Sequence, residues 1–422
     1  MATALRKLLQ NDGGPQVFVE RALQALEGAA LQTIDEFGAR EICNTLHIMA
    51  KTRYRPWDPA LVPKLEERAV ALAGTLNAQG VANTLWACAT MGLEPGAGMM
   101  RVLEGRAEAL VAGTFKAQGV ANTLWAYATL GRAPGAGLMR ELEGRAEALA
   151  GTFNGQEVAS MLWATCVLSL LLAPGQGWRW LHAVVQRFVS LGEVADLNTA
   201  QLRQIHQFFV CCSVEPRLRM EVINDMWALK ETCREAFEGA KAAPSATQQQ
   251  VSETLRHMGL SVEDEVRCPK SGYSIDMIVH DSGWRMGGER SSSTGTWAVE
   301  FDGPSHFLTS RAPTGATLLK RRHLELLGHA LVTVPYWEWE GCKGAREREW
   351  YLRGKMAHFV QNPSTGGTNS RIRKDRAGRA WIPSDHAGSS REVTMASKLG
   401  PKSQRDDRPG GLLPSKFKGR AC

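Results

Sequence analysis

The sequence predicts a multidomain protein: an all-α solenoid of helical hairpins, then a small α/β domain, then a disordered basic tail. Three observations predict this organisation. The first half repeats itself about every 38 residues, the next part carries strand-like apolar runs between helical patterns, and the end has few large apolar residues. The predicted boundaries are 1–237 for the solenoid, 238–247 for a linker, 248–360 for the α/β domain and 361–422 for the tail.

The solenoid is predicted from two sequence blocks that recur in phase. The same ten residues occur at 78–87 and at 117–126, 39 residues further on, and a degraded copy follows at 156–164. The second block, Leu-Glu-x-Arg, occurs at 65–68, 103–106 and 142–145. Each copy holds two helical patterns separated by a Gly/Pro turn. One such hairpin cannot bury its own apolar face, but stacked hairpins can, which favours a solenoid.

The α/β domain is organised around a predicted strand at 297–302 that ends at a Gly-Pro turn. Alternation places Trp297, Val299 and Phe301 on one face of this strand, and Glu300 and Asp302 on the other. Two carboxylates on one strand face are costly to bury, so a purely structural strand would rarely carry them. A helix at 317–327 and a buried strand at 330–334 are expected to follow.

A helix and a strand before 297–302 complete the predicted order of helix, strand, strand, helix, strand, and one more helix closes the domain. A helix through Val251 and Leu255 opens the domain, and a strand at 273–280 places Asp276 on the face opposite its apolar residues. A long loop is expected at 281–295. A closing helix at 345–352 is expected to pack Trp350 and Leu352 inward.

Several separate blocks of this domain resemble the RAP domain, a family found in RNA-binding proteins of mitochondria and chloroplasts. They are the run from Ala298 to Phe307, the helix with Lys320-Arg321, Leu327-Gly328, and Val334 to Trp339. The likeness extends over about residues 248–358. The repeats, with their period of about 38 residues and the phrase Val-Ala-Asn-Thr-Leu-Trp-Ala, resemble the octotricopeptide repeat of organellar RNA-binding proteins.

These resemblances imply an organellar RNA-binding protein that acts in transcript stabilisation, processing or translation. The implied partners are single-stranded RNA and other organellar RNA-processing proteins, and the implied location is the mitochondrion or chloroplast. The first ten residues form a short, mildly basic and apolar stretch without the pattern of a long organellar presequence. The predicted location therefore depends on the resemblance alone. Because the repeat pattern begins within about 40 residues, we expect either a truncated gene model or a targeting region that this sequence does not include.

Candidate RNA-binding side chains come from both parts of the chain. They are Asn83, Asn122, Arg68, Arg106, Arg145, His306, Lys320 and Arg321. The two asparagines either read bases or bridge adjacent backbones. The three arginines form a column that is either a solvated helix face or a line of phosphate contacts. Trp86, Trp125 and Trp163 keep a fixed phase with apolar neighbours, which favours inter-repeat core over base stacking.

A second hypothesis is a metal-dependent RNA endonuclease. The RAP domain resembles the restriction-endonuclease-like fold, in which acidic side chains hold a metal that activates water. Asp276, Glu300, Asp302 and Lys320 are the candidate catalytic residues, with Mg²⁺ as the cofactor of this alternative alone. That fold usually has lysine two residues after the glutamate, where this chain has Asp302. A hydrogen-bonded polar cluster is therefore the favoured interpretation, and fold likeness alone is weak support for catalysis.

The composition of the chain permits a third hypothesis, a protein-interaction scaffold without an RNA role. The tail holds 13 of the 50 basic and 5 of the 43 acidic residues, so the rest of the chain is nearly neutral despite the net charge of +7. The tail is either without a role or a basic arm that binds any phosphate backbone. The nine cysteines contain no CxxC pair, which favours buried free thiols over disulfides or zinc. No apolar run approaches the roughly 20 residues that cross a bilayer, so no membrane partner is expected.

Overall fold

The computed structural model describes most of the chain up to Val360. The described ranges are 16–168, 179–191, 197–215, 226–239, 243–280, 285–286, 289–290 and 296–360. These residues belong to one compact unit. The predicted tail at 361–422 lies outside them. None of the described helices combines the length and the apolar character that a bilayer crossing needs.

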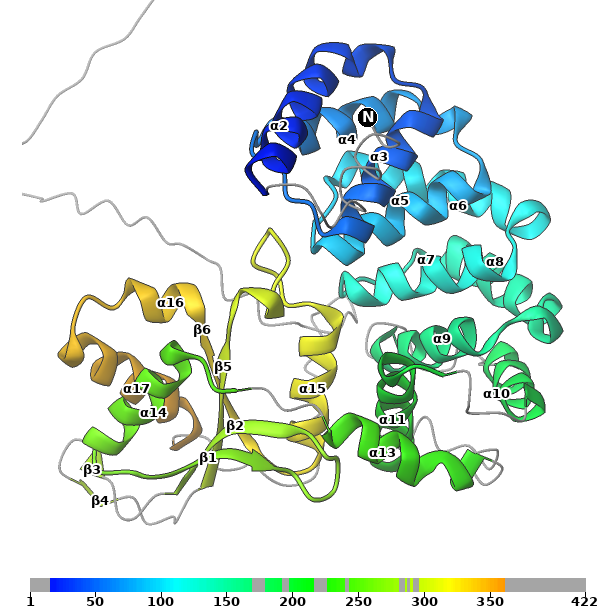
Figure 1. The fold of residues 1–422 in the computed structure, drawn as a ribbon. Coiled ribbons are helices and arrows are strands. Elements are labelled where there is room, and N and C mark those ends of the chain that lie inside the picture. The colour runs from blue at the N-terminus through cyan, green and yellow to red at the C-terminus, as the bar shows by residue number, and fades with distance from the viewer. Residues whose placement is uncertain are drawn as a thin grey trace, which may run out of the picture. The chain divides into compact units, whose positions relative to one another are not determined.

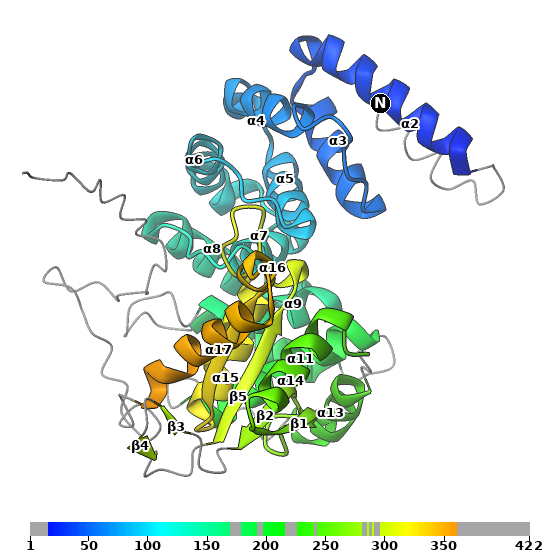
Figure 2. The same ribbon diagram turned by 90° about the vertical axis from the view of Figure 1, so that its left-hand side faces the viewer.

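The first part is helical, as predicted, and its helices alternate between two layers. The inner helices are α3 (Ala39–Thr52), α5 (Ala78–Met91), α7 (Ala117–Thr129), α9 (Gly155–Leu168) and α11 (Thr199–Val214). The outer helices are α2 (Gln16–Thr33), α4 (Leu61–Ala71), α6 (Ala97–Thr114), α8 (Ala136–Ala148) and α10 (Arg179–Leu191). Each inner helix packs on the next inner helix, and α4, α6, α8 and α10 pack on one another (Figure 1, Figure 2). The last helix of this part is α13 (Lys230–Glu238), which packs on α11.

The repeated Leu-Glu-x-Arg sequence explains how consecutive hairpins are joined. In α6, Leu103 is buried in the core. Arg106 donates from Nε to the carbonyl oxygen of Leu76, which precedes α5, at 2.8 Å. Glu104 accepts a hydrogen bond at 3.0 Å from the backbone N–H of Gly135, which precedes α8. One turn of α6 therefore binds both the segment before α5 and the segment before α8. These contacts require Leu-Glu-x-Arg once in each repeat, which explains its period.

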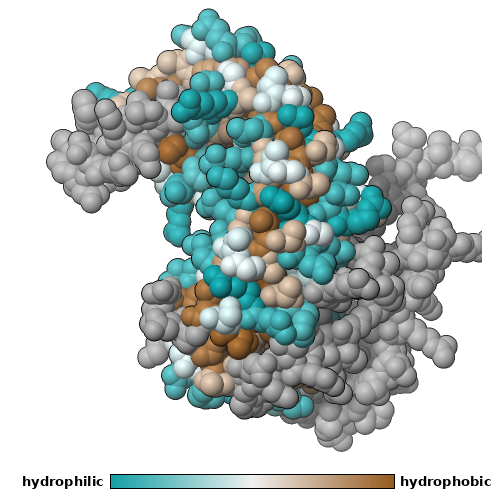
Figure 3. Space-filling model, turned by 90° about the vertical axis from the view of Figure 1, so that its right-hand side faces the viewer, coloured by the Kyte–Doolittle hydropathy of each residue, from teal (hydrophilic) through white to brown (hydrophobic). Residues whose placement is uncertain are grey.

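The outer layer faces the viewer in Figure 3, on the side that carries α6, α8 and α10. Its surface is mostly hydrophilic, with narrower hydrophobic strips. A mixed surface of this kind is normal for a folded protein, because polar groups are too few to cover it. This layer therefore needs no partner to explain its composition.

The second part is a small α/β structure around a four-stranded mixed sheet in the order β1-β2-β5-β6. The strands are β1 (Ser261–Arg267), β2 (Ser274–His280), β5 (Thr296–Asp302) and β6 (Ala330–Pro335). The helices are α14 (Ala246–His257), α15 (Gly315–Leu326), α16 (Tyr336–Gly341) and α17 (Ala345–Val360). β2 runs antiparallel to β1 and β5, whereas β5 and β6 are parallel and connected through α15.

Both faces of the sheet are covered, and the repeat helices cover one of them. Apolar residues of α14, α16 and α17 pack on Trp297 and Val299. On the other face, Ala298 belongs to a core that contains Leu324 of α15 together with Val210 of α11. This alternation along β5 follows the predicted pattern. The α/β part therefore completes its hydrophobic core with side chains from the end of the helical array.

A glycine permits the close approach of α15 to the array. A Cβ atom at Gly315 would lie 1.8 Å from the carbonyl oxygen of Ala128 in α7, far inside van der Waals contact. The loop before α15 also bonds to the array. Thr309 donates its backbone N–H to the carbonyl oxygen of Gly92 at 2.9 Å, and its hydroxyl accepts from the N–H of Glu94 at 3.2 Å. Figure 2 shows this loop lying over the ends of the inner helices.

Three sequence expectations for the α/β part were incomplete or wrong. Strand β1 was not predicted, because its alternation includes four charged residues and little apolar character. Two short strands, β3 (Arg285–Met286) and β4 (Glu289–Arg290), lie in the stretch expected to be a loop. Trp350 was expected to pack inward with Leu352, but its side chain is 79% exposed while Leu352 is buried. The helical spacing of two residues turns Trp350 about 160° away from the buried face.

The shared core leads to a prediction about fragments. A 248–360 fragment would expose the sheet face that Val210 and Phe237 now cover, so we expect it to be less stable than a 199–360 fragment and to self-associate. The two fragments are compared by urea unfolding and by light scattering. A 248–360 fragment that is monomeric and as stable as the longer one would show that α11 and α13 contribute no essential core.

Candidate functional site

The candidate site lies where the parallel strands β5 and β6 end side by side. Asp302 and Pro335 are paired at the carboxyl ends of these strands. Ligands of open α/β sheets commonly bind outside this end. The chain after β5 makes a short 3₁₀ turn (Pro304–His306) and a loop before α15, while α16 follows β6 directly. Charged and aromatic side chains from all of these segments surround this edge.

The acidic residues converge, as the sequence predicted. Met277 pairs with Val299 across the antiparallel strands, which brings the preceding Asp276 to the end of β5 that carries Glu300 and Asp302. Asp276 accepts a hydrogen bond from the backbone N–H of Phe301 at 2.8 Å. Glu300 and Asp302 are each 2% exposed. Three carboxylates thus meet around the inner face of β5, and each has a partner of its own.

Two cations of α15 pair with the carboxylates of Glu300 and Asp302, and one histidine contacts Asp302. Lys320 forms an ion pair with Glu300. The guanidinium of Arg321 lies 2.6 Å from Asp302 Oδ2, and His306 Nδ1 lies 3.1 Å from Asp302 Oδ1. Lys320 and Arg321 are successive residues, so one helix turn serves two acids that are two residues apart on a strand. All four charged residues are therefore held in place by one another.

Burial and charge divide the three acids into two classes. Burial is the largest effect on Glu300; Lys320 opposes it, Asp276 adds to it, and together they raise the pKa of Glu300 to about 8. Burial likewise raises the pKa of Asp276. For Asp302 burial also opposes ionisation, but the His306 hydrogen bond and the charge of Arg321 outweigh it and lower the pKa. The cluster thus holds one firmly ionised carboxylate beside two that take up protons easily.

Replacing Glu300 with Gln is expected to flatten the pH dependence of stability. The pKa rises from 4.5 when unfolded to about 8 when folded. Unfolding therefore releases a proton between these values, and the native chain loses stability as pH rises through this window. Gln cannot ionise, so the free energy of unfolding of the variant should rise relative to that of the native chain between about pH 5 and pH 9. The expected relative rise is roughly 1.4 kcal/mol per pH unit or less. Urea unfolding at several pH values measures this.

The exposed Glu253 on α14 provides the control, because its carboxylate lies in water. The difference in free energy of unfolding between the Glu253→Gln variant and the native chain should be the same at every pH. If Glu300→Gln also runs parallel to the native curve, the raised pKa is wrong.

The acidic cluster is not preorganised for a metal ion. One group of three ligand atoms within 4.8 Å of one another occurs among the described residues, and it is Cys211, Glu215 and His323, not the acidic cluster. Asp276, Glu300 and Asp302 instead bind a backbone N–H, a lysine and an arginine. One feature favours a cation: Glu300 Oε1 is buried and makes no hydrogen bond within the described residues. The geometry therefore favours a polar cluster over a loaded catalytic site.

An aromatic group beside the cluster was missed by the sequence analysis. Phe307 and Trp337 have ring centroids 4.3 Å apart in an edge-on arrangement, and Tyr336 packs against Trp337 at 5.1 Å. The guanidinium of Arg311 lies over the Trp337 ring, 5.2 Å from its centroid. All three rings are partly exposed. The signal was the aromatic run that follows β6, which the sequence analysis used only as part of the RAP likeness.

On the helical array, the polar residues at the repeated phase lie on one face of the inner helices. Asn83 and Asn122 are partly exposed, and neither side-chain amide makes a hydrogen bond within the described residues. One turn earlier on the same face, Gln79 and Gln118 are exposed. Unpaired amides are available to a ligand, which favours base contact over the alternative of bridging adjacent backbones.

The tryptophans of the repeats stack against one another along the same face. The ring centroids of Trp86 and Trp125 are 6.5 Å apart, and those of Trp125 and Trp163 are 6.4 Å apart. Trp163 is buried, and the other two are packed against the core with part of each ring exposed. The interpretation of these residues as inter-repeat core agrees with this packing.

The arginine column has a structural task in every repeat. Arg68, Arg106 and Arg145 each donate from Nε to a backbone carbonyl oxygen that precedes an inner helix, at 2.8–2.9 Å. Arg187 of α10 does the same to Phe153 at 2.9 Å, and the sequence analysis missed this member because no Leu-Glu precedes it in phase. The Nε atoms of these arginines therefore join consecutive repeats and are not available to bind phosphate.

Family matches cover both parts of the chain. Residues 299–355, which contain the acidic strand, α15 and α16, match the family model of the RAP domain. The chain carries a RAP domain. Residues 16–171, which form the helical array up to α9, match the family model described as RNA-editing substrate-binding complex 6 protein.

Two curated relatives match parts of the chain. A chloroplastic RAP domain-containing protein of Oryza sativa subsp. japonica is 24% identical over 350 residues, which is 82% of this chain and 50% of the relative. The mitochondrial FAST kinase domain-containing protein 3 of Bos taurus is 44% identical over 66 residues, 15% of this chain and 10% of the relative. The chain thus spans about half the length of the first relative. Both relatives are organellar, which bears out the organellar location. The two family models support an RNA-related function.

Proposed function

We propose that this protein binds single-stranded RNA in an organelle and acts in transcript stabilisation, processing or translation. The observation that carries the proposal is the amide face of the inner helices, where Asn83 and Asn122 present free hydrogen-bonding groups one repeat apart. Bases can be read in this way only when they are unpaired. The family match of the array to an RNA-editing substrate-binding complex protein supports the same partner, and other organellar RNA-processing proteins are proposed as further partners.

The RAP domain is proposed to hold an end or an unpaired nucleotide of the same RNA. Trp337 and Phe307 offer ring surfaces for base stacking, and Arg311 lies beside them. His306, Lys320 and Arg321 are engaged by carboxylates, so their proposed role is to neutralise this edge. The mixed sheet with acids on β2 and β5 supports a restriction-endonuclease-like fold as a proposal, with the cluster acting in binding and not in cleavage.

The proposal is tested by comparing labelled single-stranded RNA with a duplex of the same sequence, using the full chain. We expect the single strand to bind about tenfold more tightly, a difference of about 1.4 kcal/mol, and binding to weaken as salt rises. Equal affinity for the two forms would contradict base reading, and no measurable affinity would support a protein-interaction scaffold instead.

Cleavage is measured in the same samples with Mg²⁺ or Mn²⁺, beside a Glu300→Gln, Asp302→Asn double variant. We expect binding without cleavage, and a variant that is less stable because Lys320 and Arg321 lose their partners. Metal-dependent cleavage that a folded double variant lacks would instead assign an endonuclease to the acidic cluster.

A further inference from the structure

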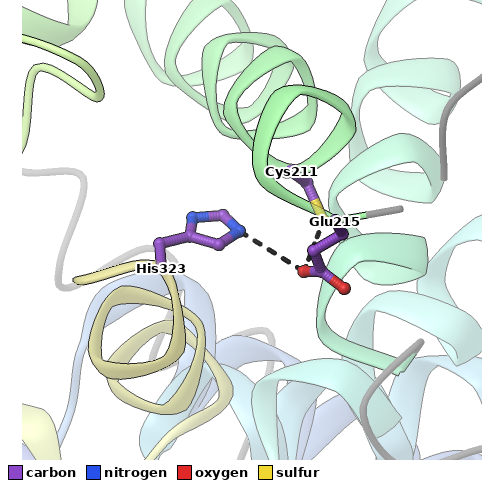
Figure 4. Close-up of side chains that lie close together, drawn as sticks. All are labelled: Cys211, Glu215 and His323. Atoms are coloured by element: carbon purple, nitrogen blue, oxygen red, sulfur yellow. Dashed lines mark hydrogen bonds and ion pairs between the residues drawn. The ribbon is translucent and has the colours of Figure 1, made fainter. Parts of the chain in front are cut away.

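The RAP domain already uses one side to contact the helical array. Arg322 of α15 forms a buried ion pair with Glu215 of α11 and lies 3.7 Å from Cys211 Sγ. Figure 4 shows Cys211, Glu215 and His323 converging at this contact. The guanidinium of Arg322 fills the contact, so the chain itself occupies this side of the domain. Exposed surface for a partner lies across the sheet, on α17.

The outer face of α17 carries an aromatic side chain that takes no part in the core. Trp350 is 79% exposed, which makes it the most exposed large apolar side chain among the residues that the structure describes. Leu352 and Met356 of the same helix are buried against the sheet. A single exposed apolar residue is ordinary on a protein surface, so the surroundings of Trp350 decide whether it has a function.

Two arginines lie along the helix on either side of Trp350. Side chains three and four residues apart on a helix are neighbours, which places Arg346 before the ring and Arg353 after it. Arg346 is exposed and Arg353 is partly exposed. The acid at the same spacing, Glu347, accepts a hydrogen bond from the backbone N–H of Lys343 at 2.8 Å, which holds it at the start of the helix. An aromatic ring between two guanidinium groups offers base stacking and phosphate contact together.

The helix surface that follows Trp350 is open. Gly354 lies one turn further on, and a Cβ atom there would meet no other atom within 4 Å. Glycine is a poorer helix former than alanine, and no neighbour among the described residues requires it at this position. A residue without a side chain lets the backbone of a ligand approach closely. Gly354 therefore keeps the surface beside the ring accessible.

This face adjoins the aromatic group of the candidate site. Tyr351 donates its hydroxyl to Glu338 of α16 at 2.7 Å, and Lys355 Nζ lies 2.8 Å from the same carboxylate. Glu338 directly follows Trp337, the ring proposed to stack on a base. Helix α17 is therefore bonded to the short helix that carries Trp337, and Figures 1 and 2 show the two helices adjoining. A single strand that leaves Trp337 can continue along α17.

We propose that Trp350, with Arg346 and Arg353, is a second stacking site for single-stranded RNA and continues the path from Trp337 along the outer face of α17. The inference rests on the proposed RNA-binding function and adds a surface to it. One base stacks on the Trp350 ring, and the arginines contact the phosphates on either side. The basic tail begins directly after α17, with 13 basic and 5 acidic residues in 361–422, so the charge of the chain also favours a polyanion at this end of the domain.

The proposal is tested on the full chain with two substitutions at one position. Trp350→Phe keeps an aromatic ring, whereas Trp350→Leu keeps apolar character without one. We expect Trp350→Leu to lower the affinity for labelled single-stranded RNA about fivefold or more, and Trp350→Phe to lower it less than about twofold, because stacking needs a ring. The side chain is exposed, so both variants should unfold at the native urea midpoint. Equal RNA affinity of Trp350→Leu and the native chain would indicate an apolar contact with a protein or with the tail, and would overturn the proposal.

Leu326→Ala is the matched control. Leu326, the last residue of α15, is also a large exposed apolar side chain of the RAP domain, and its removal should leave RNA affinity within about twofold. An affinity loss equal to that of Trp350→Leu would show that the effect is not specific to the ring and would also reject the site.

Ultraviolet crosslinking of the bound RNA gives a second measurement. We expect a crosslink in the tryptic peptide 349–353, which contains Trp350, and its loss in Trp350→Leu. RNA that binds the native chain without a crosslink in this peptide would contradict the stacking site alone. A native chain that binds no single-stranded RNA would contradict the proposed function and this site with it.

Discussion

Replacing Asp302 with Asn is expected to destabilise the protein by about 3 kcal/mol, because it leaves the charge of Arg321 without its buried partner. The Asp302 side chain is 3% exposed and lies 2.6 Å from Arg321 and 3.1 Å from His306. Asn keeps the shape of the side chain but not the charge. The measurement is urea unfolding of the full chain near pH 7, read from the change in midpoint at constant slope.

The chain offers a matched control in a second Arg–Asp pair. Arg256 and Asp264 are 44% and 40% exposed, so Asp264→Asn should cost less than about 1 kcal/mol. The pH dependence provides a second check. Because the pKa of Asp302 is lowered in the folded state, the stabilisation from this pair is present at neutral pH and is lost as pH falls through the folded pKa. Similar effects of the two substitutions at pH 7 would mean that Asp302 is not held as described.

A paired substitution on the inner helices should have the largest effect on RNA affinity. Changing Asn83 and Asn122 to Glu places two carboxylates on the face proposed to contact RNA, where they repel phosphate and remove the amides. We expect single-stranded RNA affinity to fall at least tenfold, or about 1.4 kcal/mol, while the thermal unfolding curve stays close to that of the native chain. Both residues are partly exposed, so the new charges remain solvated.

The outer helices offer the matched control at the same repeat spacing. Ala109 of α6 and Ala148 of α8 are exposed and 39 residues apart, as Asn83 and Asn122 are. The Ala109→Glu, Ala148→Glu variant adds the same net charge and should leave RNA affinity within about twofold. Equal losses in the two variants would indicate a long-range charge effect and would remove the inner face from the proposed RNA path.

The acidic cluster could be predicted only in part from local sequence patterns. Period-two alternation placed Glu300 and Asp302 on one face of β5, and the neighbouring strand β2 supplied Asp276, which accepts a hydrogen bond from the N–H of Phe301. Sequence alone does not pair Lys320 with Glu300 or Arg321 with Asp302, because helix rotation and docking decide which carboxylate each cation meets. The aromatic group of Phe307 and Trp337 was missed for the same reason, since it joins the loop after β5 to helix α16 after β6.

By itself, the sequence determined the helical repeats, the strand alternation and the RAP likeness, because each depends on spacing within a helix turn, a pleat or one repeat. Only the tertiary structure decided which groups meet between parts of the chain. The arginine column proved to bind backbone carbonyls, the sheet completed its core with Val210 and Phe237, and Cys211 came to lie beside His323. These contacts depend on the docking of surfaces far apart in sequence, and no local period records that geometry.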